Sequence, residues 1–275
     1  MSSNWNEPWT NSEGMSHREI VERIANDPGI RERVEATLAE DPEVQEGRRL
    51  YAEAAGPLLA ELQQLVPDLE AINHKLEGVG DLYRVQVRHV DEDGNETSRR
   101  PLDYRAAVPV LLEWLPKVRY APLAEDIVSA LSAPFAKKQA RPLLLRLFRE
   151  SLPVENPQRP DNTAYFREQL RWRIGETLGK FSDPTVADDM IELARDPSFG
   201  HARSQIVNPG LAKTKDPRVP EILLDLLEDP TVAPAAAQGL GRLRHTPAQP
   251  HLERALHSTD ENLRYQAKKA LKRLT

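Results

Sequence analysis

The stretch DPRVPEILLDLLEDPTVAPAAAQGLGRL, residues 216–243, decides the fold because it holds two helix-forming segments, each opened by an Asp-Pro pair. Asp216-Pro217 follows Asp183-Pro184 by 33 residues. Asp229-Pro230 follows Asp196-Pro197 by the same interval. A period of about 30 to 47 residues made of paired helices is typical of helical repeat arrays, in which each unit buries its apolar face against its neighbours. The stretch therefore predicts a stack of helical hairpins.

The second helices of these hairpins align on a leucine near their C-terminal ends: Leu131, Leu178, Leu211, Leu240 and Leu271. Four positions earlier stand Ile127, Ile174, Val207, Ala236 and Ala267, and the residue just before the leucine is always small. Eight positions earlier the residue is apolar in every hairpin except the third, which has Arg203. Because these offsets lie on one face of a helix, they predict its buried face.

The first helices carry a proline near their expected start, at Pro109, Pro142, Pro220 and Pro250. In the first turn of a helix the missing N–H of proline costs nothing. The aspartate before each repeated proline is placed to cap the helix and to face the positive end of its dipole.

Two segments carry a family resemblance: VPEILLDLL (219–227) and LRYQAKKAL (263–271) resemble HEAT repeats. They are most similar to the short type first described in bilin lyases and seen in many bacterial proteins. The resemblance covers roughly residues 101–275 and implies an all-α solenoid. It also implies a protein-binding scaffold more often than an enzyme.

We predict three parts of the chain: a flexible tail at 1–16, an N-terminal helical region at 17–100, and an α-solenoid of about five HEAT-like hairpins at 101–275. The hairpins are expected at 105–131, 141–181, 185–214, 219–243 and 250–274. The prolines of loop 153–160 should deny it regular structure, and Pro209 should kink or break the second helix of the third hairpin.

Within 17–100, helices are expected at 17–40 (two short ones), 42–66 and 67–76. Apolar and polar residues then alternate from Tyr83, and Asp93-Gly94 supplies a turn signal. A small β-hairpin at 83–100 is the expected structure, with an ordered loop as the alternative.

Composition indicates a cytoplasmic protein. The chain has 275 residues, no cysteine and a net charge of −6. The lack of cysteine suits a reducing compartment, and no apolar run reaches the ~18 residues of a membrane span. Residues 1–100 hold 11 Lys+Arg and 21 Asp+Glu, whereas residues 101–275 hold 26 and 22. This asymmetry is consistent with solvation alone, with an autoinhibitory contact between the two parts, or with steering of an acidic partner.

No catalytic residue, metal site or cofactor is predicted. His245, His251 and His257 are spaced six apart, which matches no metal-ligand spacing. Gly239-Leu-Gly241 lies inside a helix, so its glycines are read as packing positions. Basic residues recur two positions after the aligned leucines, at Lys180, Lys213, Arg242 and Arg273. They could follow a phosphate backbone, but the pI of 5.7 and the preference of helix C-termini for cations make nucleic acid an improbable partner.

The residues two and six positions before each aligned leucine should lie opposite the buried face, on the side that lines the concave groove in HEAT arrays. They are mostly polar, as exposure requires, and Trp172 and Tyr265 are the large aromatic exceptions. Exposed aromatic residues are typical anchors at protein interfaces. The predicted partner-binding residues are Trp172, Tyr265, Gln205, Gln238 and Lys269. The alternatives are that Trp172 covers the 153–160 loop and that Tyr265 packs on the C-terminal end.

The first functional hypothesis is a non-enzymatic scaffold that binds a protein partner in the groove. The alternative is an enzyme or enzyme auxiliary on a HEAT scaffold, with bilin-lyase-like or DNA-glycosylase-like activity.

Overall fold

The computed structural model describes residues 29, 32, 38, 40–91 and 95–274. Contacts between Cα atoms divide the chain into two compact units, Met1–Leu50 and Tyr51–Thr275. The tail predicted at 1–16 and most of the region predicted as short helices at 17–40 lie outside the described residues. The domain limits predicted from the sequence remain predictions.

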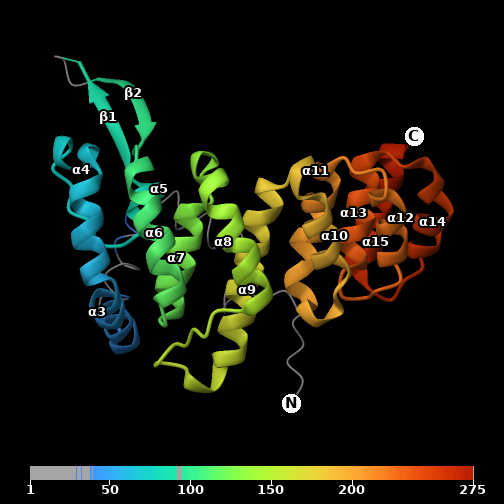
Figure 1. The fold of residues 1–275 in the computed structure, drawn as a ribbon, viewed down its shortest axis with the longest axis horizontal. Coiled ribbons are helices and arrows are strands. Elements are labelled where there is room, and N and C mark those ends of the chain that lie inside the picture. The colour runs from blue at the N-terminus through green and yellow to red at the C-terminus, as the bar shows by residue number, and fades with distance from the viewer. Residues whose placement is uncertain (1–28, 30–31, 33–37, 39, 92–94, 275) are drawn as a thin grey trace. The chain divides into compact units, whose positions relative to one another are not determined.

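Among the described residues, five helical hairpins follow one another from residue 105 to residue 274 (Figure 1). Their first helices are α6 (Val108–Trp114), α8 (Lys137–Glu150), α10 (Ala187–Arg195), α12 (Val219–Leu226) and α14 (Gln249–Ala255). Their second helices are α7 (Ala121–Leu131), α9 (Thr163–Phe181), the consecutive segments η7 (Ile206–Leu211) and α11 (Ala212–Thr214), α13 (Ala233–Leu243) and α15 (Glu261–Leu274). The predicted all-α repeat fold is confirmed.

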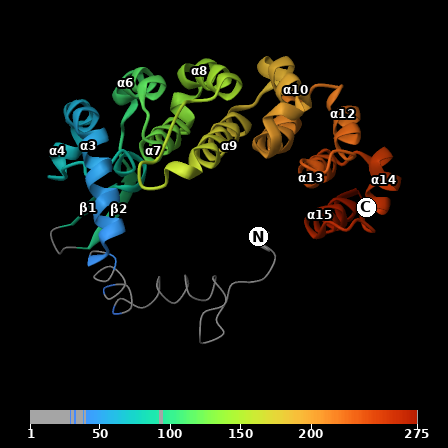
Figure 2. The ribbon, with the colours of Figure 1, turned by 90° about the horizontal axis from the view of Figure 1, so that it is seen from below.

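Short 3-10 segments introduce or link these helices: η1 (Arg105–Ala107), η2 (Leu115–Lys117), η3 (Pro134–Ala136), η4 (Pro160–Asn162), η5 (Pro184–Val186), η6 (Pro197–Arg203) and η8 (Thr246–Ala248). Each second helix contacts the first helix of its own hairpin, and each of the first four also contacts the second helix of the next hairpin. The first helices therefore form one row and the second helices another (Figure 2). None of the described helices has both the length and the apolar character needed to cross a lipid bilayer.

The predicted buried face of the second helices is confirmed. Leu131, Leu178, Leu211 and Leu240 are each at most 1% exposed. The residues four and one positions before them are also buried in every hairpin. Leu263 and Leu271 are only half-buried, because no sixth hairpin covers α15 in the part of the chain that the structure describes.

Arg203, the polar exception on the buried face, is 1% exposed and is held by two partners. Its Nη1 donates to the carbonyl oxygen of Ala194 at 2.9 Å, and its Nη2 pairs with the carboxylate of Asp229. Asp229 begins the link to α13, so the ion pair joins the third and fourth hairpins. A buried charge is tolerated when it is paired and hydrogen-bonded in this way.

The four aspartates of the repeated Asp-Pro pairs make the same hydrogen bond. Asp183 and Asp196 are the N-caps of η5 and η6, whereas Asp216 and Asp229 lie in the turns that precede α12 and α13. In each case the carboxylate accepts a hydrogen bond from the backbone N–H two residues later. The donors are Thr185 (2.9 Å to Asp183), Ser198 (2.8 Å to Asp196), Arg218 (2.9 Å to Asp216) and Thr231 (2.9 Å to Asp229). The repeat in the sequence thus corresponds to a repeated hydrogen bond. The predicted helix cap is confirmed at Asp183 and Asp196, whereas at Asp216 and Asp229 the bond closes a turn before the helix.

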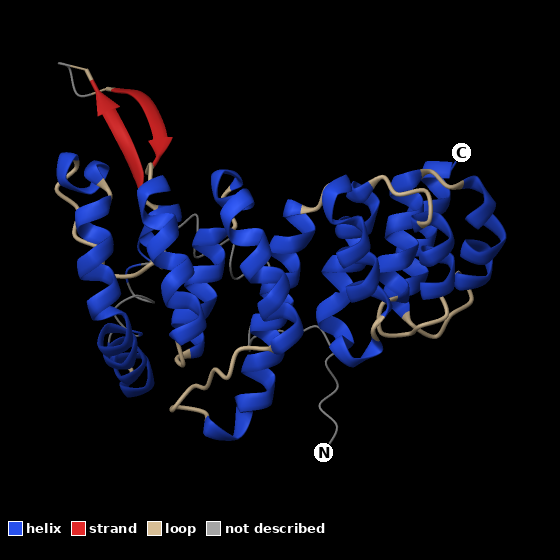
Figure 3. Ribbon diagram, in the orientation of Figure 1, coloured by secondary structure: helices blue, strands red, loops and turns tan. Residues whose placement is uncertain are grey.

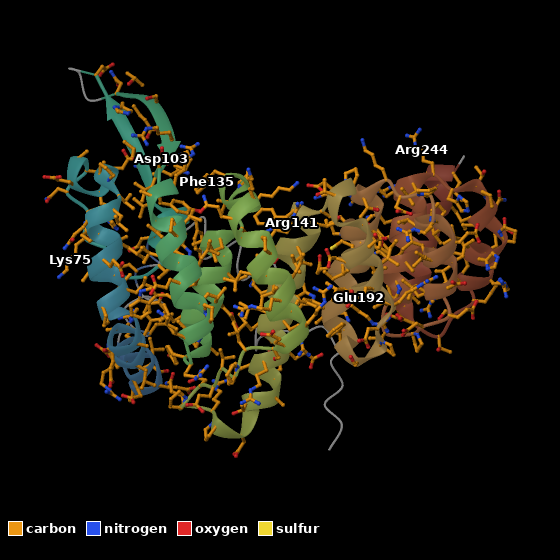
Figure 4. The ribbon with its side chains drawn as sticks, viewed as in Figure 1. Lys75, Asp103, Phe135, Arg141, Glu192 and Arg244 are labelled. Atoms are coloured by element: carbon orange, nitrogen blue, oxygen red, sulfur yellow. The ribbon has the colours of Figure 1, made fainter. Side chains whose placement is uncertain are left out.

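Ion pairs also connect the second and third hairpins, near the labelled residues Arg141 and Glu192 (Figure 4). Arg141 Nη1 lies 2.7 Å from an oxygen of Asp183, and Arg149 Nη2 lies 3.0 Å from an oxygen of Glu192. These pairs are partly exposed, so each contributes little to stability by itself. They add polar links to the apolar contacts between the two hairpins.

Gly241 of α13 is a close-approach position, as predicted for the glycines of this helix. A Cβ added there would lie 2.6 Å from Ala270 Cα in α15. At Gly239 an added Cβ would lie 3.0 Å from Leu223 Cδ1 in α12. The two glycines therefore let α13 pack closely against a helix on each side.

Two prolines interrupt helices in different ways. Pro142 lies inside α8, which begins at Lys137, so the prediction that it starts the helix is wrong. Its side chain is exposed, so the lost backbone hydrogen bond does not lie in the core. The break predicted at Pro209 is confirmed, because Asn208 has an extended backbone (φ −149°, ψ 123°) within η7.

The region before the hairpins contains α3 (Pro42–Leu65), α4 (Pro67–Ala71) and α5 (Asp81–Arg84). The helix predicted to run to residue 76 is wrong in its length. It ends at Ala71 because Asn73 takes a left-handed conformation (φ 51°) and His74 N donates to Leu69 O at 2.8 Å, which closes the helix end.

The predicted β-hairpin is present as β1 (Gln86–Val90) and β2 (Glu96–Pro101), which pair antiparallel (Figure 3). Its first strand was expected to start at Tyr83, and that part of the prediction is wrong. Tyr83 belongs to α5, where its hydroxyl donates to Asp126 Oδ1 at 2.9 Å. A contact 43 residues away in the sequence therefore overrides the local alternation.

Candidate partner-binding face

The residues two and six positions before each aligned leucine are accessible along the row of second helices. Tyr265 is 57% exposed, Lys269 is exposed, and the rest are half-buried. The half-buried residues are Glu125, Trp172, Gln205, Pro234, Ser129, Glu176, Pro209 and Gln238. These side chains form an accessible face opposite the buried leucines. We call it the second-helix face.

A depression of about 230 Å³ opens on this face across α9, η7, α13 and α15. Trp172 lines it together with five carboxamide side chains, those of Gln205, Asn208, Gln238, Asn262 and Gln266. The other lining residues are His201, Ser204, Thr231, Val232, Pro234 and Ala235. We call this depression the amide hollow. Three predicted binding residues, Trp172, Gln205 and Gln238, meet in it.

Tyr265 and Lys269, the other two predicted residues, do not line the amide hollow. Lys269 Nζ lies 5.0 Å from the centre of the Tyr265 ring, which is a cation–π contact on the surface of α15. The structure thus separates the five residues into a group of three and an exposed pair. The binding role of all five remains a prediction.

Trp172 lines the amide hollow, and Arg173 Cζ lies 5.7 Å from the centre of its ring. Loop 153–160 is hydrogen-bonded to the chain at the start of α7. Glu155 donates its N–H to Arg119 O at 2.8 Å, and its carbonyl oxygen accepts from the N–H of Ala121, the first residue of α7, at 2.9 Å. These bonds form an isolated bridge within an otherwise irregular loop, in keeping with its prolines.

Two carboxamides of the amide hollow have unmet hydrogen-bonding capacity. Asn208 is 5% exposed, and its Nδ2 donates to Gln238 Oε1, but its Oδ1 is buried without a partner among the described residues. Gln266 Nε2 donates to Asn262 Oδ1 at 3.4 Å, and its buried Oε1 likewise has no partner in this part of the chain. Buried polar atoms are nearly always paired in proteins. A turn of either side chain toward the hollow would therefore let its unpaired oxygen bond with a ligand.

Asn208, Asn262 and Gln266 are not among the residues predicted from the sequence. They stand three, nine and five positions before the aligned leucine, whereas the accessible face is predicted from the residues two and six positions before it. The available signal for Asn208 was its place before Pro209, since a helix broken there cannot keep regular side-chain directions.

A second depression on the second-helix face, of about 410 Å³, lies between α7 and α9 and is charged. Arg173 and Lys180 line it and pair with Glu176 at 2.9 and 3.1 Å. Burial opposes ionisation of Glu176, but hydrogen bonds from Lys180 and Arg173 lower its pKa overall. Burial raises the pKa of the nearby Glu125. The carboxylate of Glu176 is thus shared by two cations within the protein.

The basic residues after the aligned leucines have a structural role at one position. Lys213 Nζ lies 3.1 Å from Gly179 O and 3.0 Å from Lys180 O, at the C-terminal end of α9. This contact satisfies helix carbonyl oxygens and is favoured by the helix dipole. Across the residues described, no group of three or more His, Cys, Asp or Glu side chains is arranged to hold a metal ion.

The repeated hairpins, the stacked rows of helices and the repeated hydrogen bonds of the Asp-Pro pairs define a helical repeat protein. Comparison with known families agrees: the model described as PBS lyase HEAT-like repeat matches residues 235–258, from within α13 to just after α14. The chain is a HEAT-like repeat protein. No curated protein matches it.

Proposed function

We propose that this protein is a non-enzymatic scaffold that holds a protein partner in a groove along its second-helix face, in a bacterial cytoplasm. The amide hollow carries the proposal. There, the indole of Trp172 stands half-buried among polar side chains, two of which keep unpaired buried atoms. A large aromatic residue surrounded by polar groups is the usual composition of an interface anchor.

The chemistry of the lining supports binding over catalysis. Carboxamides, hydroxyls and an indole donate and accept hydrogen bonds without changing charge near neutral pH. His201 is the only titratable side chain among the lining residues, and it is exposed. Such a surface is suited to holding a partner in one orientation.

Affinity capture with the full chain tests the proposal. We expect one partner protein to be retained in stoichiometric amount and to be lost with Trp172→Ala. Tyr265→Ala should weaken retention if the exposed pair on α15 also contacts the partner.

Trp114→Ala is the matched control, because Trp114 is also half-buried but belongs to α6 in the row of first helices. Loss of the partner with Trp114→Ala but not with Trp172→Ala would contradict the choice of face. Salt-dependent retention of DNA, or activity on an added tetrapyrrole, would favour the enzyme alternative.

A further inference from the structure

We propose that the amide hollow binds an extended, uncharged peptide segment, whose main-chain amides pair with the carboxamides and one of whose apolar side chains packs on Trp172. The inference rests on the proposed function, because it specifies what kind of partner the second-helix face accepts. It adds that the partner is a linear segment read through its backbone.

The carboxamides of the amide hollow come from three successive hairpins. Gln205 and Asn208 come from the third hairpin, Gln238 from the fourth, and Asn262 and Gln266 from the fifth. Each carboxamide offers two N–H donors and a carbonyl acceptor. Each peptide unit of a bound segment offers one donor and one acceptor of the same kind. A row of carboxamides is therefore complementary to an extended main chain.

Asn208 and Gln266 each keep a buried amide oxygen that has no hydrogen-bond partner among the described residues. Asn208 is fixed from one side by Gln238, which leaves the other end of its amide unpaired. Because an amide can turn by 180°, the unpaired end is either a donor or an acceptor, and a peptide unit supplies a partner for both. The extended backbone at Asn208 interrupts the helix where the side chain meets the hollow. Gln266 adds an unpaired acceptor on the next hairpin but one.

The lining of the amide hollow is uncharged apart from any charge on His201. The residues that line the amide hollow include no Asp, Glu, Lys or Arg. A phosphate backbone is bound through Lys and Arg contacts, so this lining does not favour nucleic acid. A charged peptide side chain would lose its hydration here without gaining a counter-ion. The neutral lining and the indole of Trp172 both favour an uncharged segment with an apolar or aromatic side chain.

The length of the segment follows from the spacing of helices. Packed helices lie about 8 to 10 Å apart, so the four second helices around the hollow, from α9 to α15, span roughly 24 to 30 Å. An extended chain advances about 3.3 Å per residue, so about seven to nine residues would cross the row.

Selection from a library of random 12-residue peptides, with the full chain as bait, tests the inference. The tightest peptide is then synthesised in versions with a single N-methylated backbone amide, and dissociation constants are measured by fluorescence anisotropy. We expect at least two interior N-methyl groups to weaken binding 10-fold or more. We expect Gln266→Leu and Asn208→Leu to have a similar effect. Gln249→Leu, on the outer helix α14, should leave binding unchanged.

Three outcomes would overturn the inference: no selected peptide binds, N-methylation has no effect, or maltohexaose or a ten-residue oligothymidine binds in the hollow instead. Circular dichroism on each variant separates lost binding from lost folding. If a captured partner depends on Trp172 while no peptide binds, the scaffold proposal stands and the linear-segment inference fails. If neither depends on Trp172, both fail.

Discussion

The ion pair between Arg203 and Asp229 gives the sharpest prediction about stability. Arg203 is 1% exposed, so Asp229→Ala would leave a buried guanidinium with only the Ala194 carbonyl as partner. Breaking a buried pair by removing one partner costs about 3 to 5 kcal/mol. The Asp229 side chain is 27% exposed, so a value near the lower end is expected. Loss of the hydrogen bond that it accepts from Thr231 N contributes about 1 kcal/mol of this.

Arg203→Met should cost clearly less than Asp229→Ala, below about 2 kcal/mol. The substitution removes the buried charge and places an apolar residue at a position that is apolar in the other hairpins. The partly exposed carboxylate of Asp229 remains hydrated and still accepts the hydrogen bond from Thr231 N. The double variant should be only about 1 kcal/mol less stable than Arg203→Met alone, because once the ion pair is gone Asp229→Ala removes only the hydrogen bond from Thr231 N.

Urea unfolding followed by far-UV circular dichroism measures these differences. Asp216→Ala is the matched control. Asp216 accepts the same hydrogen bond from the backbone N–H two residues later, but the side chain of its ion-pair partner Arg218 is 55% exposed, so a smaller loss of stability is expected. If Asp229→Ala is no more destabilising than Asp216→Ala, or if Arg203→Met is the most harmful change, the account of this ion pair is wrong.

Three further predictions concern packing, pH and the proposed anchor. Gly241→Ala should destabilise by about 1 to 2 kcal/mol in urea unfolding, because its Cβ would overlap Ala270, whereas Gly56→Ala, with no atom within 4 Å, should stabilise by about 0.5 to 1 kcal/mol. Hydrogen bonds from Arg100 lower the pKa of Asp68 to about 2, below its usual value near 4 in an unfolded chain. The ionised Asp68 therefore stabilises the folded protein fully above about pH 4, and this contribution disappears as the pH falls to about 2. Arg100→Gln should therefore flatten the decline of stability over that interval, and an unchanged slope would contradict the assignment. Trp172→Ala should leave the free energy of unfolding in urea nearly unchanged. A decrease of roughly 3 to 5 kcal/mol in that free energy would instead identify Trp172 as a core residue.

The parts of the fold that could be predicted are those set by short-range periodicity. The buried leucines recur because every hairpin meets its neighbours in the same way, so one register describes the second helices. Arg203 broke that register, and only the structure supplies its partner, since Asp229 belongs to the next hairpin. Tyr83 was assigned to a strand for the same reason, because its contact with Asp126 is not local.

The candidate site was predictable only in part. Trp172, Gln205 and Gln238 could be found because they occupy the offsets opposite the buried face. Asn208 and Gln266 could not, because their importance lies in an unpaired atom, which depends on what each neighbouring helix offers. The break at Pro209 further removed Asn208 from any helical register.

Hydrogen–deuterium exchange of the full chain, with and without the captured partner, tests the central claim most directly. The account predicts slower exchange in α9, α13 and the segment Ile206–Thr214 when the partner is bound, with α8, α10 and α12 unchanged. Slower exchange confined to those first helices, with no change around Trp172, would contradict it.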